Sequence, residues 1–338
     1  MNRMERKNIL LTGASGTVGF EVLKQLVEKD RYNITVFDQK TKNSVEKFLP
    51  FKNDVRLIYG DITNPEDLKA IEHIDVAIHL AAIIPPLADE APELAHKVNV
   101  EGTLNLIQQL ENQSPKVFFM YSSSISVYGD RIDNPYIEVG DPLIPSEGDA
   151  YAVTKIESER NVQKSALDWT IFRLAAIMGN HKMSKLMFHQ PLDTALEIAT
   201  PRDTARAFVN GIEKQDQLSK HIFNLGGGES CRMTYDQFLE RSFEIFGLGE
   251  LDFPEKAFAD KNFHCGYYKD GMDLEKIVNF RQDTIEDYFE MEASKVSTLK
   301  KTAASIFQKP VKWYLLKQSE PYQAYKEKDQ KAMKHYFN

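Results

Sequence analysis

Residues 7–19 read KNILLTGASGTVG and are the most informative part of the sequence. The apolar run Lys7–Leu11 ends in Thr-Gly, which suits a buried strand, and Val18–Glu28 carries apolar residues at helical spacing. Glycines with the spacing GxxGxxG lie between the two elements. The first two permit a tight turn close to a pyrophosphate, and the third lets the helix pack closely on the sheet. This unit predicts a dinucleotide site with the contact residues Gly13, Ser15, Gly16, Thr17, Val18 and Gly19.

Short apolar runs alternate with helical stretches through the rest of the first half. The expected strands are Ile34–Phe37, Val55–Tyr59, Val76–Leu80, Val117–Tyr121 and Trp169–Leu174, and the longer expected helices are Leu94–Leu110 and Tyr151–Gln163. This alternation implies right-handed crossovers and a parallel sheet covered on both faces. The predicted fold class is therefore α/β, with a Rossmann-type doubly wound parallel sheet.

The pattern becomes less regular after Arg173. Helices are expected at Asp203–Glu213 and Tyr235–Phe246, with a strand at Ile222–Leu225. These elements indicate a smaller mixed α/β lobe at the C-terminal side. The expected domains are residues 1–172 for the dinucleotide, residues 173–293 for a substrate-binding lobe interwoven with the first domain, and residues 294–338 as a basic tail.

Composition excludes several classes of protein. Apolar residues make up 42% of the 338 positions and charged residues 27%, which is typical of a globular chain and excludes a disordered or collagen-like one. Cys231 and Cys265 cannot build a disulfide framework and lack CxxC spacing, and the eight histidines form no ligand motif, so no metal is expected. No apolar run is long enough to span a bilayer, and the N-terminus does not read as a secretory signal. The expected compartment is the cytoplasm.

The net charge of −8 is unevenly distributed. Residues 294–338 contain ten lysines and three acids, a net charge of +7, which leaves −15 on the rest of the chain. An acidic body disfavours nonspecific nucleic-acid binding. In the tail, lysines alternate with apolar residues in VKWYLLK (311–317). Three interpretations stay open: packing on the acidic body or ordinary solvation, contact with a protein partner, and docking on an anionic membrane surface.

Polar and small residues follow the expected strands at the edge where their carboxyl ends meet. Asp38 ends the second strand, where a carboxylate can accept both ribose hydroxyls of an adenosine and repel a 2′-phosphate. NAD is therefore favoured over NADP, although Lys40 lies close enough to weaken that preference. Asp61 and Ile62 are expected near the adenine. The strand ends Leu80, Ala81, Ala82, Ser122, Ser123 and Ser124 open onto the same edge.

Tyr151 and Lys155 lie four residues apart in YAVTK, on one face of an expected helix. A lysine ammonium near a phenol favours the phenolate and lowers the pKa of the tyrosine. Such a tyrosine can take the proton of a substrate hydroxyl while hydride leaves the same carbon. A YxxxK pair alone is common, but the serine cluster and the glycine turn at one sheet edge strengthen this interpretation.

The combination of these motifs resembles the extended short-chain dehydrogenase/reductases, the NAD-dependent epimerase/dehydratase family. The resemblance covers roughly residues 7–290. The matching segments are TGASGTVG (12–19), Asp38, GDI (60–62), HLAA (79–82), NVEGTLNL (99–106), SSSISVYG (122–129) and YAVTK (151–155), with weaker matches in RLAAIMG (173–179), RDTARAF (202–208) and NLGGGE (224–229).

The resemblance implies a role for each matching residue. Tyr151 matches the catalytic acid/base, Lys155 the residue that holds the nicotinamide ribose and polarises the tyrosine, and Ser124 the hydroxyl that positions the substrate oxygen. Asn99 matches a supporting position, and Ala81 and Ala82 match the backbone that lines the cofactor. The resemblance also implies a homodimer through the helices near 94–110 and 151–163.

The sequence departs from the family pattern at two places. Sugar-nucleotide dehydratases carry an Asp-Glu pair just after the Ser124 position, where this chain has Ile125-Ser126, so dehydratase activity is disfavoured. The asparagine that epimerases carry after the arginine of the sixth strand is absent from Arg173-Leu174-Ala175-Ala176, and the segment 179–204 is short for a nucleotide-sugar clamp. His181, Lys182, Lys185, His189 and Arg202 are candidates for an anionic substrate group, or else solvated loop charges.

The sequence thus predicts an NAD-dependent oxidoreductase or epimerase that moves hydride between nicotinamide C4 and a hydroxyl or carbonyl carbon. Its substrate is a small molecule, with sugars and nucleotide sugars among the candidates. One alternative is a carbonyl reductase or dehydrogenase of a small non-sugar compound. The other is a non-catalytic NAD(H)-binding regulatory protein on the same fold, against which the set of Ser124, Tyr151 and Lys155 argues.

Overall fold

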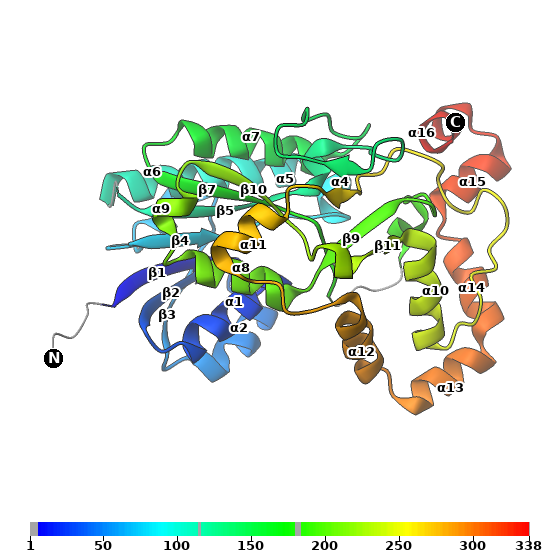
Figure 1. The fold of residues 1–338 in the computed structure, drawn as a ribbon, viewed down its shortest axis with the longest axis horizontal. Helices are drawn as coiled ribbons and strands as arrows, with labels where there is room; N and C mark the ends of the chain where they lie inside the picture. The colour runs from blue at the N-terminus through cyan, green and yellow to red at the C-terminus, as the bar shows by residue number, and fades with distance from the viewer. Residues whose placement is uncertain (1–5, 114–115, 180–183, 338) are drawn as a thin grey trace.

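The computed structural model describes residues 6–113, 116–179 and 184–337. A seven-stranded parallel sheet forms one side of the molecule, with the strand order β10-β7-β5-β4-β1-β2-β3 (Figure 1). Its strands are β1 (Lys7–Thr12), β2 (Tyr32–Asp38), β3 (Val55–Tyr59), β4 (Val76–His79), β5 (Phe118–Ser124), β7 (Asp168–Leu174) and β10 (His221–Leu225). The predicted doubly wound parallel sheet is confirmed.

Helices cover both faces of this sheet because alternate strand residues point to opposite sides. Ile9 and Leu11 pack in one cluster with the helices α1 and α8, whereas Leu10 packs in another with α6 and α7. The two helical layers lie below and above the sheet in Figure 1. The helices of this part are α1 (Thr17–Glu28), α2 (Lys42–Phe48), α3 (Pro65–Leu68), α4 (Leu87–Glu90), α5 (Pro92–His96), α6 (Gly102–Gln113), α7 (Ala150–Lys164), α8 (Pro201–Gly211), α9 (Gln215–Leu218) and α11 (Met272–Val278).

A smaller mixed lobe lies beside the carboxyl ends of the central strands. It contains a three-stranded sheet in which β9 pairs in parallel with β8 and antiparallel with β11. A two-stranded sheet joins β6, from the first half of the chain, to β12. The elements are β6 (Tyr136–Ile137), β8 (Ala176–Ile177), β9 (Ala195–Ala199), β11 (Arg232–Thr234), β12 (Tyr267–Tyr268), α10 (Tyr235–Phe246) and α12 (Ile285–Lys295). Since β10 returns to the large sheet, the two parts are interleaved along the chain.

The stretch 94–110, expected as one helix, is divided. A π-helical turn at Lys97–Glu101 separates α5 from α6. The widened turn contains Asn99, which is 1% exposed and has its side chain bonded outside the helix. Hydrophobic spacing does not reveal such a turn, and the apolar positions do not all face the core: Leu94 and Leu104 are 42% and 38% exposed, whereas Leu106, Ile107 and Leu110 are buried.

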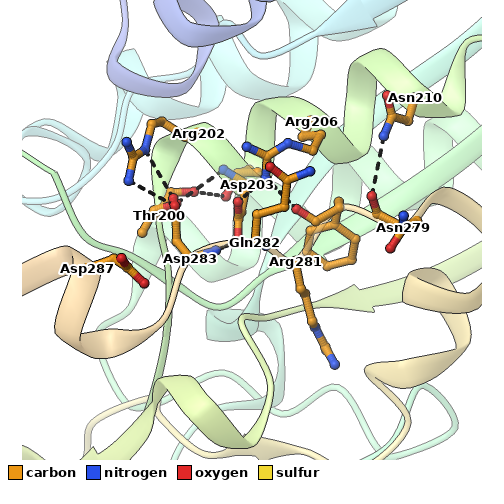
Figure 2. A network of polar contacts seen from close by, with 12 residues as sticks. Thr200, Arg202, Asp203, Arg206, Asn210, Asn279, Arg281, Gln282, Asp283 and Asp287 are labelled. Carbon is orange, nitrogen blue, oxygen red and sulfur yellow. Dashed lines mark hydrogen bonds and ion pairs between the residues drawn. The ribbon is translucent and has the colours of Figure 1, made fainter.

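A network of charged side chains joins α8 to the segment that leads into α12 (Figure 2). Asp203, at the start of α8, accepts hydrogen bonds from the backbone N–H groups of Gln282 and Asp283, both at 2.9 Å, and pairs with Arg206. Asp283 in turn accepts from Thr200 and pairs with Arg202 at 2.8 Å. Asp203 is 1% exposed, so its carboxylate is held away from water by the two backbone donors and Arg206.

The basic tail forms four helices around the outside of the smaller lobe, drawn in orange and red in Figure 1. They are α13 (Thr298–Ile306), α14 (Gln308–Leu316), α15 (Glu320–Glu327) and α16 (Gln330–Tyr336). Leu315, Ala324 and Phe337 are buried, and the Ser319 hydroxyl donates to the carbonyl of Ala257 at 2.6 Å. The tail therefore packs on the lobe through these side chains. In the part of the chain that the structure describes, no helix is both long and apolar enough to cross a bilayer.

We expect Asp203→Ala to lower the free energy of unfolding by about 3 kcal/mol, because it removes two charge-assisted hydrogen bonds to backbone N–H groups and the ion pair with Arg206. Urea unfolding followed by circular dichroism measures this change. Asp273→Ala is the matched control: its exposed carboxylate forms a surface pair with Lys276, so its loss should cost less than about 0.5 kcal/mol. Equal effects of the two substitutions would contradict the structural role of Asp203.

Candidate active site

The glycine turn after β1 is built for close approach of the backbone. Gly13 has a φ of +71°, and a Cβ there would lie 2.6 Å from the backbone nitrogen of Ala81. A Cβ on Gly19 would lie 2.1 Å from the carbonyl oxygen of Gly13, so only glycine allows α1 to meet the turn. α1 begins after Gly16 without a side-chain cap, which leaves its first N–H groups for an anion. Thr17 and Val18 form its first turn, and this arrangement fits the pyrophosphate of a dinucleotide.

Asp38, at the end of β2, is bonded to the same turn. Its Oδ2 accepts from the backbone N–H of Ser15 at 2.8 Å, and its Oδ1 accepts from the Ser15 hydroxyl at 3.1 Å and from Gln39 N–H at 2.8 Å. Burial raises the pKa of this carboxyl, and the bonds from Ser15 oppose the rise. Lys47, which the sequence did not single out, donates to the Ser15 carbonyl at 2.6 Å. Asp38 thus holds the turn as well as lying where an adenosine ribose was predicted.

The other expected cofactor residues lie at the ends of β3 and β4. Asp61 is exposed, and its side chain accepts from Thr63 N–H at 2.9 Å, whereas Ile62 is buried. Leu80, Ala81 and Ala82 directly follow β4 and are half-buried. The sheet order places the end of β4 beside the end of β1, so this loop borders the glycine turn.

Lys155 is buried at the end of β5. Its Nζ donates to the carbonyl of Ser122 at 2.8 Å and lies 5.6 Å from the centre of the Tyr151 ring. The residue is 2% exposed, and burial lowers its pKa to about 7. The Ser122 hydroxyl donates to the carbonyl of His79. Ser122 therefore contacts Lys155 through its backbone oxygen and not through its hydroxyl. An ammonium has three donors, which leaves capacity for ribose hydroxyls.

Tyr151 and Ser124 meet where α7 approaches the end of β5. Burial is the main cause that raises the pKa of Tyr151, the charge of Asp149 raises it further, and a hydrogen bond with Ser124 opposes the rise. The expected lowering of this pKa by Lys155 is therefore wrong for the protein alone. The physical reason is that burial disfavours the ammonium as well as the phenolate, so desolvation of the phenol outweighs the effect of the lysine.

Asn99 braces the helix that carries these two residues. Its Oδ1 accepts from Ile83 N–H at 2.7 Å, and its Nδ2 donates to the Ile83 carbonyl at 2.9 Å and to the Thr154 hydroxyl at 3.0 Å. The Thr154 hydroxyl in turn donates a hydrogen bond to the carbonyl of Tyr151 at 2.7 Å. Asn99 therefore connects the loop after β4 to the first turn of α7, and its side chain is fully used by the protein.

An apolar cavity of about 300 Å³ extends from Ser124 into the smaller lobe. Its wall is formed largely by side chains from β8, β9, α10, α12 and the helical turn Lys185–Phe188, among them Met187, Leu196, Phe238, Leu239 and Phe289. The polar groups that border it include Ser124 at one end and Glu292 of α12. A site of this kind holds a mainly apolar small molecule and orients it with a few polar contacts.

A histidine and an aspartate that sequence reasoning missed connect this cavity to α7. His264 lines the cavity, and its Nδ1 lies 2.9 Å from Oδ2 of Asp149. Asp149 caps α7 by accepting from Ala152 N–H at 2.8 Å. The pair is far apart in the sequence, and no local motif marks it. By contrast, His79 is a core residue as expected, bonded to Thr12 and Thr103, and burial lowers its pKa to about 3.

Three of the cationic side chains that were candidates for binding an anionic substrate group lie outside the lining of the apolar cavity. Lys185 pairs with Glu90 and Glu320, His189 also contacts Glu320 at 2.8 Å, and Arg202 pairs with Asp283. None of these three cations lines the apolar cavity, and each is paired with a carboxylate of the protein. His181 and Lys182 lie outside the described residues. Among the residues that the structure describes, no group of three or more potential ligands could hold a metal ion.

A family model identifies the class of protein. The NAD dependent epimerase/dehydratase family matches residues 9–226, more than half of the chain. The chain belongs to this family, which is NAD-dependent.

Individual relatives match only part of the chain, at modest sequence identity. A 3-beta-hydroxysteroid dehydrogenase from Mycolicibacterium neoaurum is 32% identical over 170 residues, which cover 47% of this chain and 43% of that protein. A D-erythronate dehydrogenase from Cupriavidus necator is 23% identical over 257 residues, covering 65% of this chain and 77% of the relative. The chain therefore spans less than half of the first relative.

Solved structures show the same fold at low identity. The UDP-glucuronic acid 4-epimerase from Bacillus cereus, in complex with UDP-glucuronic acid and NAD, superimposes with a TM-score of 0.71 and 19% identity. The match covers 85% of this chain and 98% of the epimerase chain. At this identity the likeness supports the fold alone.

We expect wild type to gain stability relative to Lys155→Met as the pH rises above 7. The folded pKa of Lys155 is about 7 and the unfolded value about 10.4, so below pH 7 the buried ammonium destabilises the fold. Above pH 7 only the folded state loses the proton, and the penalty falls by about 2–3 kcal/mol by pH 9. Chemical unfolding of both proteins at pH 6 and 9 measures the difference. A difference independent of pH would contradict the buried, desolvated lysine.

Proposed function

We propose that the protein is an NAD-dependent dehydrogenase or reductase acting on a secondary hydroxyl or ketone of a mainly apolar molecule. The apolar cavity that reaches Ser124 supports this proposal most strongly. Most of its described lining residues are apolar, and no lysine or arginine is among them to bind the phosphates of a nucleotide. The hydroxysteroid dehydrogenase among the relatives agrees with this substrate class.

Each residue of the site has a separate role in the proposed reaction. The Ser124 hydroxyl lies at the cavity end and holds the substrate oxygen by a hydrogen bond. Tyr151, its hydrogen-bond partner, exchanges the proton of that oxygen. Lys155 holds the ribose, and Asn99 and Asp149 keep α7 in place. Bound NAD supplies the acceptor or donor of hydride at the substrate carbon.

The raised pKa of Tyr151 bears on the direction of proton transfer. A neutral phenol is the form that donates a proton to a carbonyl oxygen during reduction. Oxidation requires the phenolate, which is favoured only when a positive charge lies nearby. The protein alone is therefore arranged as an acid, and a nearby cationic charge in the complex would favour its use as a base.

Other activities of the family fit the site less well. Ile125 lines the cavity directly after Ser124, and Ser126 is fully buried, so no carboxylate pair is available there for elimination. Epimerisation would require a ketone intermediate to rotate in the cavity. A regulatory NAD-binding protein would not need Ser124, Tyr151 and Lys155 together.

We also propose a homodimer through α5–α7. Leu94, Leu104 and Val153 on these helices are 42%, 38% and 53% exposed. Helices at this position therefore present apolar side chains to solvent, as a subunit interface would.

We expect Tyr151→Phe to reduce turnover by about 10²–10⁴-fold, because the proton can no longer be exchanged. NAD affinity, measured by calorimetry, should stay within about twofold of wild type. Tyr325→Phe, at an exposed position on the tail helix α15, is the matched control and should keep full turnover. Turnover retained in Tyr151→Phe would refute its role.

We expect a panel of alcohols, followed by NADH absorbance, to rank bulky alicyclic secondary alcohols above UDP-glucose and D-erythronate in kcat/KM. The reason is that the cavity wall gains by burying apolar surface and leaves sugar hydroxyls unpaired. A higher kcat/KM for UDP-glucose would contradict the proposed substrate class. NAD binding with no turnover of any compound in an extended panel would favour the regulatory alternative.

A further inference from the structure

The first two tail helices carry large apolar side chains on their outer side. Leu299, Ile306, Phe307, Trp313 and Tyr314 are between 58% and 84% exposed. Leu299 and Ile306 lie on α13, Trp313 and Tyr314 lie on α14, and Phe307 joins the two helices. Both helices lie at the outer edge of the smaller lobe in Figure 1. We call these five residues the outer patch. Exposed apolar side chains gathered in this way indicate an interaction surface.

Lysines accompany the outer patch. Residues 297–317 contain Lys300, Lys301, Lys309, Lys312 and Lys317 and no acid. Lys312 pairs with Asp252, whereas no ion pair is formed by the other four with any residue that the structure describes. Lys317 lies 3.6 Å from the centre of the Trp313 ring. Exposed aromatic and aliphatic side chains mixed with unpaired lysines are typical of surfaces that bind an anionic lipid interface.

α13, which carries part of the outer patch, packs on a helix that lines the apolar cavity. Ser242, Ile245 and Phe246 of α10 line that cavity, and Gly247 ends the helix. A Cβ on Gly247 would lie 2.5 Å from the carbonyl oxygen of Lys301, so α13 packs directly on the end of α10. The surface that carries the lysines is thus next to the wall of the cavity.

We propose that α13 and α14 dock the protein on an anionic membrane surface. The aromatic and aliphatic side chains of the outer patch enter the interfacial region, and the lysines bind lipid phosphates. A second copy of the chain fits this surface poorly, because a symmetric contact would bring two groups of lysines together. An apolar substrate partitions into lipid, so docking would bring the cavity to its source; only this last step rests on the proposed function.

Vesicle flotation tests the docking without any need for turnover. Full-length protein should float with vesicles of phosphatidylcholine and 30% phosphatidylglycerol and remain at the bottom with phosphatidylcholine alone. The variant Phe307→Ser/Trp313→Ser/Tyr314→Ser should lower the partition coefficient at least tenfold, and so should Lys300→Gln/Lys309→Gln/Lys317→Gln. The matched controls are Leu49→Ser/Tyr136→Ser/Ile144→Ser and Lys29→Gln/Lys42→Gln/Lys52→Gln, at exposed positions elsewhere, which should float like wild type.

Tryptophan fluorescence gives a second readout at the surface itself. The chain has two tryptophans, and Trp169 is buried. The substitution Trp169→Phe therefore leaves Trp313 as the only tryptophan, which can be excited selectively. Its emission should shift to shorter wavelength with the anionic vesicles and be quenched by brominated acyl chains. Absence of flotation, flotation that the outer-patch variants leave unchanged, or self-association that the same variants abolish would each overturn the proposal. Loss of docking with turnover of soluble substrate intact would leave the proposed function standing.

Discussion

The contact between Lys155 and the carbonyl of Ser122 is the constraint on which the site depends. It fixes a helix to the end of a central strand, so that Tyr151, one turn before the lysine, reaches Ser124 two residues after the carbonyl. The cost is a buried ammonium, expressed in a pKa of about 7. In return, the buried Lys155 is positioned as a donor for the cofactor ribose. The Asn99 contacts hold the same helix in place.

The site combines two surfaces with different physical origins. The cofactor side follows from the parallel sheet, because the carboxyl ends of β1, β2 and β4 lie side by side and the glycine turn exposes the start of α1. The substrate side comes from the later lobe, whose strands and helices leave an apolar cavity that ends at Ser124. The network around Asp203 and Asp283 joins these parts, since it ties α8, which packs on α1, to the segment before α12.

Much of the cofactor side could be predicted from the sequence. Buried parallel strands are short apolar runs that end in turn residues, and β3 (Val55–Tyr59) has the bounds that its run predicts. α10 (Tyr235–Phe246) likewise follows its amphipathic spacing. The π-turn at Asn99 could not be predicted from local spacing, and the bonds of the Asn99 side chain to Ile83 and Thr154 form only in the folded chain.

The substrate side could be predicted far less well. The cavity collects side chains from segments between Ser124 and Glu292, and only tertiary packing brings them together. The contact between Asp149 and His264 has no counterpart in local sequence. Lysines such as Lys185 are bound by acids from distant helices, Glu90 and Glu320, which no local pattern could reveal. Cofactor residues lie within short strand–turn units, whereas the cavity depends on the whole fold.

A crystal structure of the full chain with NAD bound tests the central claim most directly. The account predicts the pyrophosphate at the start of α1, the nicotinamide ribose on Lys155, and the nicotinamide ring between Tyr151 and the Ser124 end of the apolar cavity. A nicotinamide ring outside that position, or a Tyr151 hydroxyl turned away from both the ring and the cavity, would contradict it.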